Sequence, residues 1–402
     1  MQSSLHPTLE LIRARHSERS LPGARRDGYK LGLVVEGGGM QGIISAAMLM
    51  QLSVMGLRNS FDAVYGASAG AISGAYFVAG QNQGINVYTD NLCCGRFLDL
   101  TSLLPPSIRA WNLYVSKDQR TLTSAAPTTS QAAAATSTSV SAMNTELAAA
   151  TTATRPAMDL AYLLHNVMVH DNPLDWEAVI TSSLPLKVVA SSLDELRPII
   201  LDNFTSPEDL AECLYASANV PEVAGPPRMV RGQRLVDAAV FEPIPVQSAV
   251  QDGCTHVLVL CARPASSAGG ATPVAKVAKK VLVAAVKRTV MSPDYMLDAW
   301  KTSSSDEDDD ALYDSLPSVR NASFERFGAH VLPLFPETTG GAHPVCVEVP
   351  KLLAGKAEGV RVVKQEVGLP LGLLSNDLST MGLSSHLSKQ SDGYQGNVSP
   401  GP

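Results

Sequence analysis

One serine stands at a sharp junction between an expected strand and an expected helix. Residues 61–65 are largely apolar, residues 66–70 read Gly-Ala-Ser-Ala-Gly, and small or apolar residues continue over 71–79. Glycines two residues either side of a serine let the backbone bend without Cβ clashes, which exposes the hydroxyl above the sheet. The pattern predicts a nucleophile elbow, with Ser68 as nucleophile and Gly66 and Gly70 as its glycines. The alternative is a glycine-rich turn that only packs a helix onto a sheet.

A glycine-rich loop precedes the elbow. Residues 31–36 form a short apolar run of the kind found in buried parallel strands, and a helix is expected over 43–52. Between them, residues 37–42 read Gly-Gly-Gly-Met-Gln-Gly. Such a loop leaves backbone N–H groups uncovered at a helix N-terminus, where they suit an anion or a developing oxyanion. Two successive strand–loop–helix units predict an α/β fold.

The same loop also matches a dinucleotide-binding pattern. Gly37, Gly39 and Gly42 fit G-x-G-x-x-G, and Asp62 lies 20 residues beyond Gly42, as a ribose-binding acid would. A dinucleotide-binding oxidoreductase is therefore an alternative function. The serine elbow after the next strand favours acyl transfer, because a dinucleotide fold has no use for an exposed serine there.

Two identities are possible for the base that would activate Ser68, a histidine or Asp237. Asp237 comes at the end of an apolar strand expected over 233–240. In a Ser–Asp–His order, the base would be a histidine further along the chain, namely His256, His330 or His343. In a dyad, Asp237 would accept the proton directly. The dyad requires a pocket that desolvates the carboxylate, or an oxyanion site that carries much of the barrier.

Three motifs in this order resemble the patatin-like phospholipase family, and more closely its bacterial-type branch. They are the glycine loop at 37–42, the elbow at 66–70 and the Asp-Ala-Ala sequence at 237–239. The resemblance covers residues 30–263, with a weaker echo over 327–363. It implies a three-layer α/β/α fold with a mostly parallel central sheet.

The resemblance also implies a function and a site. The function is that of a serine-dependent lipid acyl hydrolase, a phospholipase A-like esterase, without metal or organic cofactor. Ser68 would be the nucleophile and Asp237 the base of a Ser–Asp dyad. The oxyanion hole would lie at Gly37, Gly38, Gly39 and Met40.

Two positions differ from the usual family pattern. The family usually has arginine where this chain has Gln41, and glycine where it has Ala238. The first change removes a charge near the glycine loop, and the second adds a methyl group beside the expected base. These differences motivate a second hypothesis, a catalytically weak or inactive patatin-like lipid-binding protein.

Composition divides the chain into four parts. We predict a polar N-terminal arm at 1–29, a patatin-like domain at 30–265, a C-terminal extension at 266–365 and a disordered tail at 366–402. Within the domain, residues 121–154 form a low-complexity Ala/Ser/Thr insertion. A short helix is expected at 9–15. A cationic amphipathic helix is expected at 274–290, and most such helices dock by their apolar face.

Charge and hydropathy limit the partners. A net charge of -7 and a pI near 5.6 disfavour nucleic acid. No run approaches the roughly 18 apolar residues of a transmembrane helix. The resemblance implies a lipid ester substrate, and without such a run any contact with a membrane or lipid-droplet surface would be peripheral. The first 28 residues lack the apolar core of a secretory signal, and the six cysteines lack metal-site spacing. We predict a cytoplasmic protein with reduced thiols, and organelle targeting by the N-terminal arm stays open.

Overall fold

A mixed sheet forms the middle layer of the molecule. The computed structural model describes residues 5–99, 101, 156–221, 223–265 and 327–368. In these residues the sheet has eight strands in the order β5-β6-β3-β2-β1-β7-β8, and β4 also pairs with β3. The strands are β1 Leu31–Val35, β2 Ala63–Ala67, β3 Leu186–Ser192, β4 Arg197–Leu201, β5 Arg228–Val230, β6 Gln233–Val236, β7 His256–Leu260 and β8 His330–Leu334.

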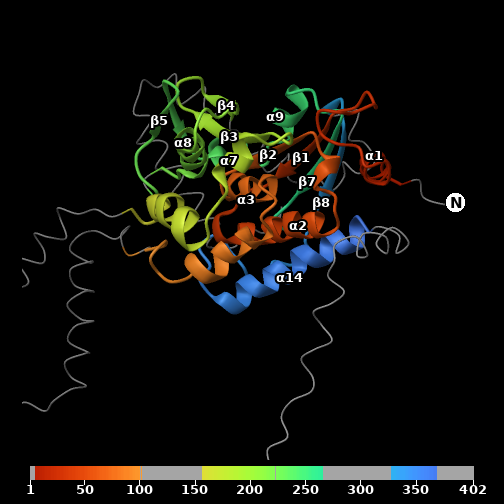
Figure 1. The fold of residues 1–402 in the computed structure, drawn as a ribbon. Coiled ribbons are helices and arrows are strands. Elements are labelled where there is room, and N and C mark those ends of the chain that lie inside the picture. Colours follow the sequence, from red (N-terminus) through yellow and green to blue (C-terminus); the bar gives the residue numbers. More distant parts are fainter. Residues whose placement is uncertain (1–4, 100, 102–155, 222, 266–326, 369–402) are drawn as a thin grey trace, which may run out of the picture.

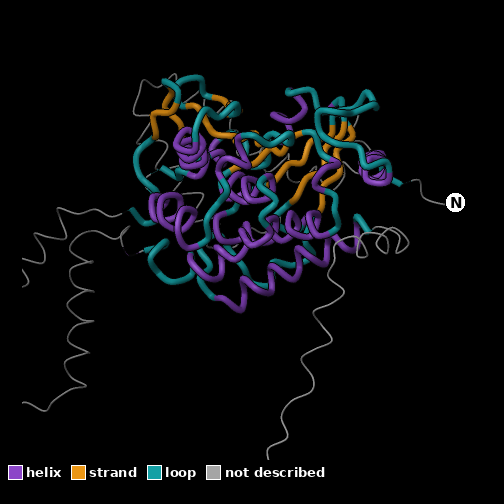
Figure 2. The backbone as a smooth tube through the Cα atoms, viewed as in Figure 1, coloured by secondary structure: helices purple, strands orange, loops and turns teal. Residues whose placement is uncertain are grey.

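Helices cover both faces of the sheet. In Figure 1, α2, α3 and α14 lie below it and α9 lies above it, and Figure 2 shows the strands between these helices. The α-helices are α1 Pro7–Ser17, α2 Ile43–Val54, α3 Ala69–Val78, α6 Leu160–Tyr162, α7 Trp176–Ile180, α8 Pro207–Ala218, α9 Val246–Gln251 and α14 Val349–Glu366. The 3₁₀ helices are η1 Gly39–Gly42, η2 Arg58–Ser60, η3 Asn82–Asn86 and η7 Ala238–Val240, and the π-helices are η4 Val87–Asn91 and η6 Leu163–Asp171.

The pairing of the strands confirms the fold class. β1 pairs in parallel with β2 and β7, β3 with β2, and β8 with β7, whereas the antiparallel pairs lie around β3 to β6. Every residue of β1, β2 and β7 is buried, as expected for parallel strands covered on both faces. Successive side chains alternate between two cores. Leu33 faces the large core with α2 and α3, and Val34 faces the smaller core with α9.

Strands β2 and β6 lie end to end along one side of β3. β4 runs antiparallel along the other side. On the shared side, β2 pairs in parallel as far as Val189, and β6 pairs antiparallel from Ser191. The carboxyl ends of β2 and β6 therefore face each other across the level of Ala190. Ser68 follows β2 and Asp237 follows β6, so this arrangement brings both to one point of the sheet.

The segments outside the central domain also contribute to the packed body. The expected helix at 9–15 is present as α1, which contacts β7 and β8. Its Arg15 is 1% exposed and is hydrogen-bonded to Asp27 and Asp62. At the other end of the chain, β8 completes the sheet and α14 packs on α2. The domain boundaries stay predictions, while α1, β8 and α14 belong to the same layers as the central elements.

Several sequence expectations lie outside the described residues. These are the insertion at 121–154, the cationic helix at 274–290 and nearly all of the tail at 366–402. Among the helices that the structure describes, none combines the length and the apolar character that crossing a bilayer requires.

Candidate active site

Ser68 occupies a strained turn between β2 and α3. Its φ of 54° and ψ of -125° lie in a region that a non-glycine residue rarely adopts. The flanking glycines are required by close approach. A Cβ on Gly66 would lie 2.4 Å from the Cα of Ala71, and a Cβ on Gly70 would lie 2.4 Å from the carbonyl oxygen of Val35. The geometry is that of a nucleophile elbow.

The Ser68 hydroxyl is paired with the Asp237 carboxylate. Ser68 Oγ donates to Asp237 Oδ2 at 2.7 Å, and the N–H of Ala239 donates to Oδ1 at 2.8 Å. Asp237 is 1% exposed, whereas Ser68 is half-buried. Burial raises the pKa of Asp237 to about 6, although both hydrogen bonds oppose the increase. A carboxyl group with such a pKa is a better base than an ordinary aspartate.

The glycine loop packs directly against the elbow. A Cβ on Gly37 would lie 2.7 Å from the carbonyl oxygen of Ala67 and 3.0 Å from the Cβ of Ser68. Gly38 and Gly39 have φ values of 123° and 56°, which favour glycine. Within the described residues, the N–H groups of Gly37, Gly38 and Gly39 make no hydrogen bond. The loop therefore presents free donors next to the serine.

A segment from the C-terminal part of the chain closes the far side of this loop. The N–H of Met40 donates to the carbonyl oxygen of Pro344 at 3.0 Å, and that oxygen would lie 2.5 Å from a Cβ on Gly39. Met40, a member of the expected oxyanion hole, thus has its N–H already bonded in this conformation. No sequence motif marks Pro344, so sequence reasoning did not single it out.

The three histidines considered as bases are not paired with Ser68. His256 and His330 begin β7 and β8, at the sheet edge opposite to the one where β2 ends. The rings of His256 and His330 lie 4.9 Å apart between centroids. His343 lies beside Pro344, and its Nδ1 is buried without a hydrogen bond in the described part of the chain. The hydroxyl of Ser68 instead contacts Asp237, which is the arrangement of a dyad.

The dinucleotide alternative is wrong on geometric grounds. Asp62 precedes β2, whereas the glycine loop follows β1, and the two strands are parallel. The proposed ribose-binding acid and the loop therefore lie at opposite edges of the sheet. Moreover, the Asp62 carboxylate accepts hydrogen bonds from Arg15, Arg25 and the N–H of Leu31. It serves as an anchor for the N-terminal segment.

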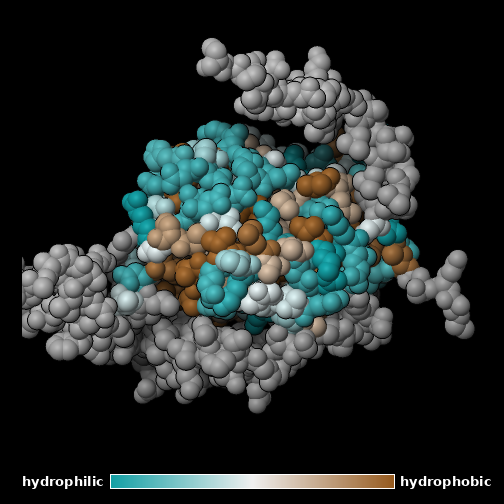
Figure 3. Space-filling model, turned by 90° about the horizontal axis from the view of Figure 1, so that it is seen from below, coloured by the Kyte–Doolittle hydropathy of each residue, from teal (hydrophilic) through white to brown (hydrophobic). Residues whose placement is uncertain are grey.

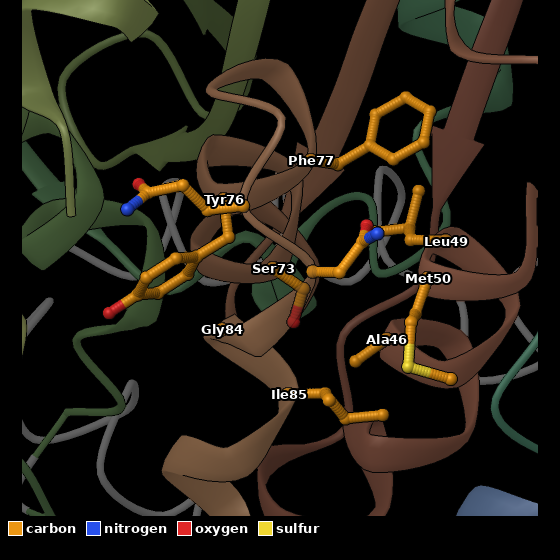
Figure 4. A pocket seen from close by; sticks show the side chains of 10 residues that line it. Ala46, Leu49, Met50, Ser73, Tyr76, Phe77, Gly84 and Ile85 are labelled. Carbon is orange, nitrogen blue, oxygen red and sulfur yellow. The ribbon is translucent and has the colours of Figure 1, made fainter. Parts of the chain in front are cut away.

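A small hollow lies further along α2 and α3, away from Ser68. It is lined by side chains that include Leu49, Met50 and Phe77 (Figure 4). Ser73 also lines it, and the Ser73 hydroxyl lies 3.3 Å from that of Tyr88. The Tyr88 hydroxyl in turn would lie 2.9 Å from a Cβ on the last glycine of the loop. Tyr88 thus stands between the hollow and the glycine loop, so the hollow is separate from the reacting hydroxyl.

Comparison with known families agrees with these features. A sequence profile described as "Patatin-like phospholipase" matches residues 33–250, which is more than half of the chain. The chain belongs to the patatin-like phospholipase family. The match contains the glycine loop, Ser68 and Asp237. Membership in this family supports lipid acyl hydrolase activity in general.

The comparisons with solved structures and with curated proteins are less informative than the family match. The crystal structure of VipD from Legionella pneumophila matches with a TM-score of 0.38 and 14% sequence identity. The match covers 84% of this chain and spans 66% of that chain's length. No curated protein matches the sequence.

Proposed function

We propose that the protein hydrolyses acyl esters of lipids with a Ser68–Asp237 dyad. The observation that carries the proposal is the 2.7 Å hydrogen bond from Ser68 Oγ to a buried Asp237 carboxylate, at the tip of a strained elbow. The family match supports the substrate class, a lipid acyl ester.

The reaction begins with the proton of the Ser68 hydroxyl. Asp237 accepts this proton while Ser68 Oγ attacks the ester carbonyl, which forms a tetrahedral oxyanion. Collapse of the oxyanion breaks the ester bond, the protonated Asp237 donates its proton to the departing alcohol, and an acyl-Ser68 ester remains. Asp237 then takes a proton from a water molecule that attacks this ester. When this second tetrahedral intermediate collapses, Asp237 returns the proton to Ser68 Oγ, so the fatty acid leaves and Ser68 is regenerated.

The glycine loop would stabilise the oxyanion. Gly37 packs against Ser68, and the N–H groups of Gly37, Gly38 and Gly39 are unused within the described residues. Backbone N–H groups fixed before the reaction stabilise developing charge without reorganisation, and losing one such donor in other enzymes slows the reaction by about 100- to 1,000-fold. We assign the hole to these three glycines, with Met40 contributing only if its bond to Pro344 opens.

Gln41 and Ala238, the two departures from the family pattern, both make specific contacts. The Gln41 side chain is buried and donates from Nε2 to the carbonyl oxygen of Ala262 at 2.9 Å. Ala238 is fully buried and packs with Ala67 and Val189. The extra methyl group therefore lies in an apolar contact and does not crowd the carboxylate. These placements favour an active enzyme over the inactive lipid-binding alternative.

Peripheral contact with a membrane or lipid droplet stays a prediction. Figure 3 shows apolar side chains gathered across the underside of the molecule, the side on which α14 lies in Figure 1. Leu353 of α14 is 48% exposed. This surface is consistent with binding at a lipid interface.

The direct test is release of fatty acid from phospholipid vesicles by the purified full chain. Wild type is expected to release fatty acid, whereas Ser68→Ala and Asp237→Asn are not, although all three bind the vesicles. Vesicle binding without release by folded wild type would favour the inactive lipid-binding alternative. Undiminished release by Ser68→Ala would refute the dyad.

A further inference from the structure

Three segments meet at the candidate active site, namely the glycine loop, the Ser68 elbow and the turn after Asp237. Each of them contacts the hydroxyl of a buried serine. These serines are Ser45 on α2, Ser191 on β3 and Ser217 on α8, and all three are 0% exposed. A serine hydroxyl carries one donor hydrogen and two acceptor lone pairs, so it can bridge backbone groups of different segments. Burying such a group costs free energy unless it is hydrogen-bonded, and in each case at least one partner is a backbone atom of the glycine loop, the Ser68 elbow or the Asp237 turn.

Ser217 holds the nucleophile elbow. Its Oγ accepts a hydrogen bond from the N–H of Ser68 at 2.9 Å and donates to the carbonyl oxygen of Val189 at 2.5 Å. Val189 is the β3 residue that pairs with Ala67, immediately before the elbow. The strained backbone of Ser68 is thus tied through one hydroxyl to the strand beside it. Removal of that hydroxyl would leave both Val189 and Ser68 without these bonds.

Ser191 and Ser45 make comparable contacts. Ser191 Oγ donates to the carbonyl oxygen of Ala238 at 3.3 Å and accepts from the N–H of Phe241 at 3.2 Å. It therefore joins the two ends of the turn that follows Asp237. Ser45 Oγ lies 3.0 Å from the carbonyl oxygen of Gly42 and 3.1 Å from that of Glu36. These two carbonyl groups lie at the two ends of the glycine loop, and both share the single hydrogen of the Ser45 hydroxyl.

We propose that Ser45, Ser191 and Ser217 are positioning residues, which fix the glycine loop, the Asp237 turn and the Ser68 elbow relative to one another. The inference rests on the proposed function. None of the three needs to touch substrate, because each acts through the backbone of a segment that does. Shifting a reacting group by 1 Å costs on the order of a hundredfold in rate, which sets the size of effect expected from losing a support.

The test measures the rate constant for covalent labelling by a fluorophosphonate, a probe of activated serines. Ser217→Ala is expected to label 10- to 100-fold more slowly than wild type, a range bounded by that cost of misplacement. Ser248→Ala is the matched control. Ser248 lies on α9 and is also buried, but its hydroxyl donates to the carboxylate of Glu242. The control should lose stability without losing labelling rate.

The pH dependence separates positioning from general support. The Asp237 carboxylate accepts a hydrogen bond from the N–H of Ala239, which lies in the turn that Ser191 holds. Among the described residues, no charged group contributes to the pKa of Asp237. Ser191→Ala should therefore move the midpoint of the labelling–pH curve upward, because a bond that lowers this pKa is weakened. Ser217→Ala should lower the rate at every pH and also raise the midpoint, because the Ser68 hydrogen bond that it misplaces lowers the same pKa.

The outcomes are distinguishable. Labelling of Ser217→Ala and Ser191→Ala at the wild-type rate and midpoint would overturn the inference and leave the proposed function intact. If Ser217→Ala does not fold, Ser217→Cys replaces it, because a thiol fills the site but is a weak donor and acceptor. Ser217→Thr, which keeps the hydroxyl, should label faster than Ser217→Cys. Absence of labelling in folded wild type would refute the proposed function, and the inference would fall with it.

Discussion

Replacing Asp237 by asparagine should stabilise the folded protein at neutral pH. The folded-state pKa of Asp237 is about 6, whereas an aspartate in an unfolded chain titrates near 3.9. The native state therefore holds the proton more tightly, and ionising the buried carboxyl group disfavours folding. This penalty is nearly absent at pH 4, grows as the pH rises towards 6, and is constant above that. Two pKa units correspond to about 3 kcal/mol at pH 8, and to less than about 1 kcal/mol at pH 4.

Asparagine removes this titration with little change of shape. It keeps the oxygen that accepts from Ala239 and cannot ionise. We expect the difference in unfolding free energy between Asp237→Asn and wild type to grow by about 2 to 3 kcal/mol from pH 4 to pH 8, in favour of the variant. Urea denaturation at several pH values measures this difference. Any packing cost of the amide shifts both values equally, so the pH-dependent part is the relevant quantity.

Asp252→Asn is a control of opposite sign. Burial raises the pKa of Asp252, but hydrogen bonds from Tyr65 and Lys30 and the charge of Lys187 lower it overall. Its ionised form therefore stabilises the folded state above the unfolded pKa, and Asp252→Asn should lose stability at pH 8 relative to wild type. A difference for Asp237→Asn that does not change with pH, or that favours wild type at pH 8, would refute the account of the buried carboxylate.

Three further predictions follow from the same geometry. The rate of serine labelling should fall as the pH drops through about 6, because protonated Asp237 cannot accept the Ser68 proton; an unchanged rate at pH 5 would contradict this. Gly37→Ala should reduce labelling at least tenfold, since its Cβ would lie 2.7 Å from a backbone oxygen beside Ser68, while circular dichroism shows retained structure. Wild-type labelling by that variant would show that the loop moves freely. Arg15→Met should lower the unfolding free energy by about 3 kcal/mol in urea titration, because it removes the bonds of a buried guanidinium to Asp27, Asp62 and a buried carbonyl group, and a loss below about 1 kcal/mol would contradict the anchoring role.

The local parts of the site could be predicted from the sequence. The elbow and the glycine loop depend on short-range requirements, namely strand, tight glycine turn and helix, which are written in consecutive residues. The expected strand at 31–36 and helix at 43–52 correspond to β1 and α2. Its place after an apolar strand makes Asp237 a candidate base, but only the resemblance chooses it over a histidine, because nothing local distinguishes it from any other carboxylate after a strand.

The long-range parts could not be predicted. The end-to-end placement of β2 and β6 depends on which side of β3 each strand takes, and β6 contains only four residues. The contact between Ser217 and Ser68 spans 149 positions. The contact between Met40 and Pro344 likewise joins distant parts of the chain. Pairings of this kind depend on tertiary packing and leave no periodic pattern in the sequence.

The central claim is that Ser68 is a nucleophile activated by Asp237. The most direct measurement is fluorophosphonate labelling of the purified full chain, with the modified peptide identified by mass spectrometry. The account predicts a single adduct on Ser68 in wild type, none in Ser68→Ala and strongly slowed labelling in Asp237→Asn. Folded wild type that takes up no probe, or an adduct that persists in Ser68→Ala, would contradict it.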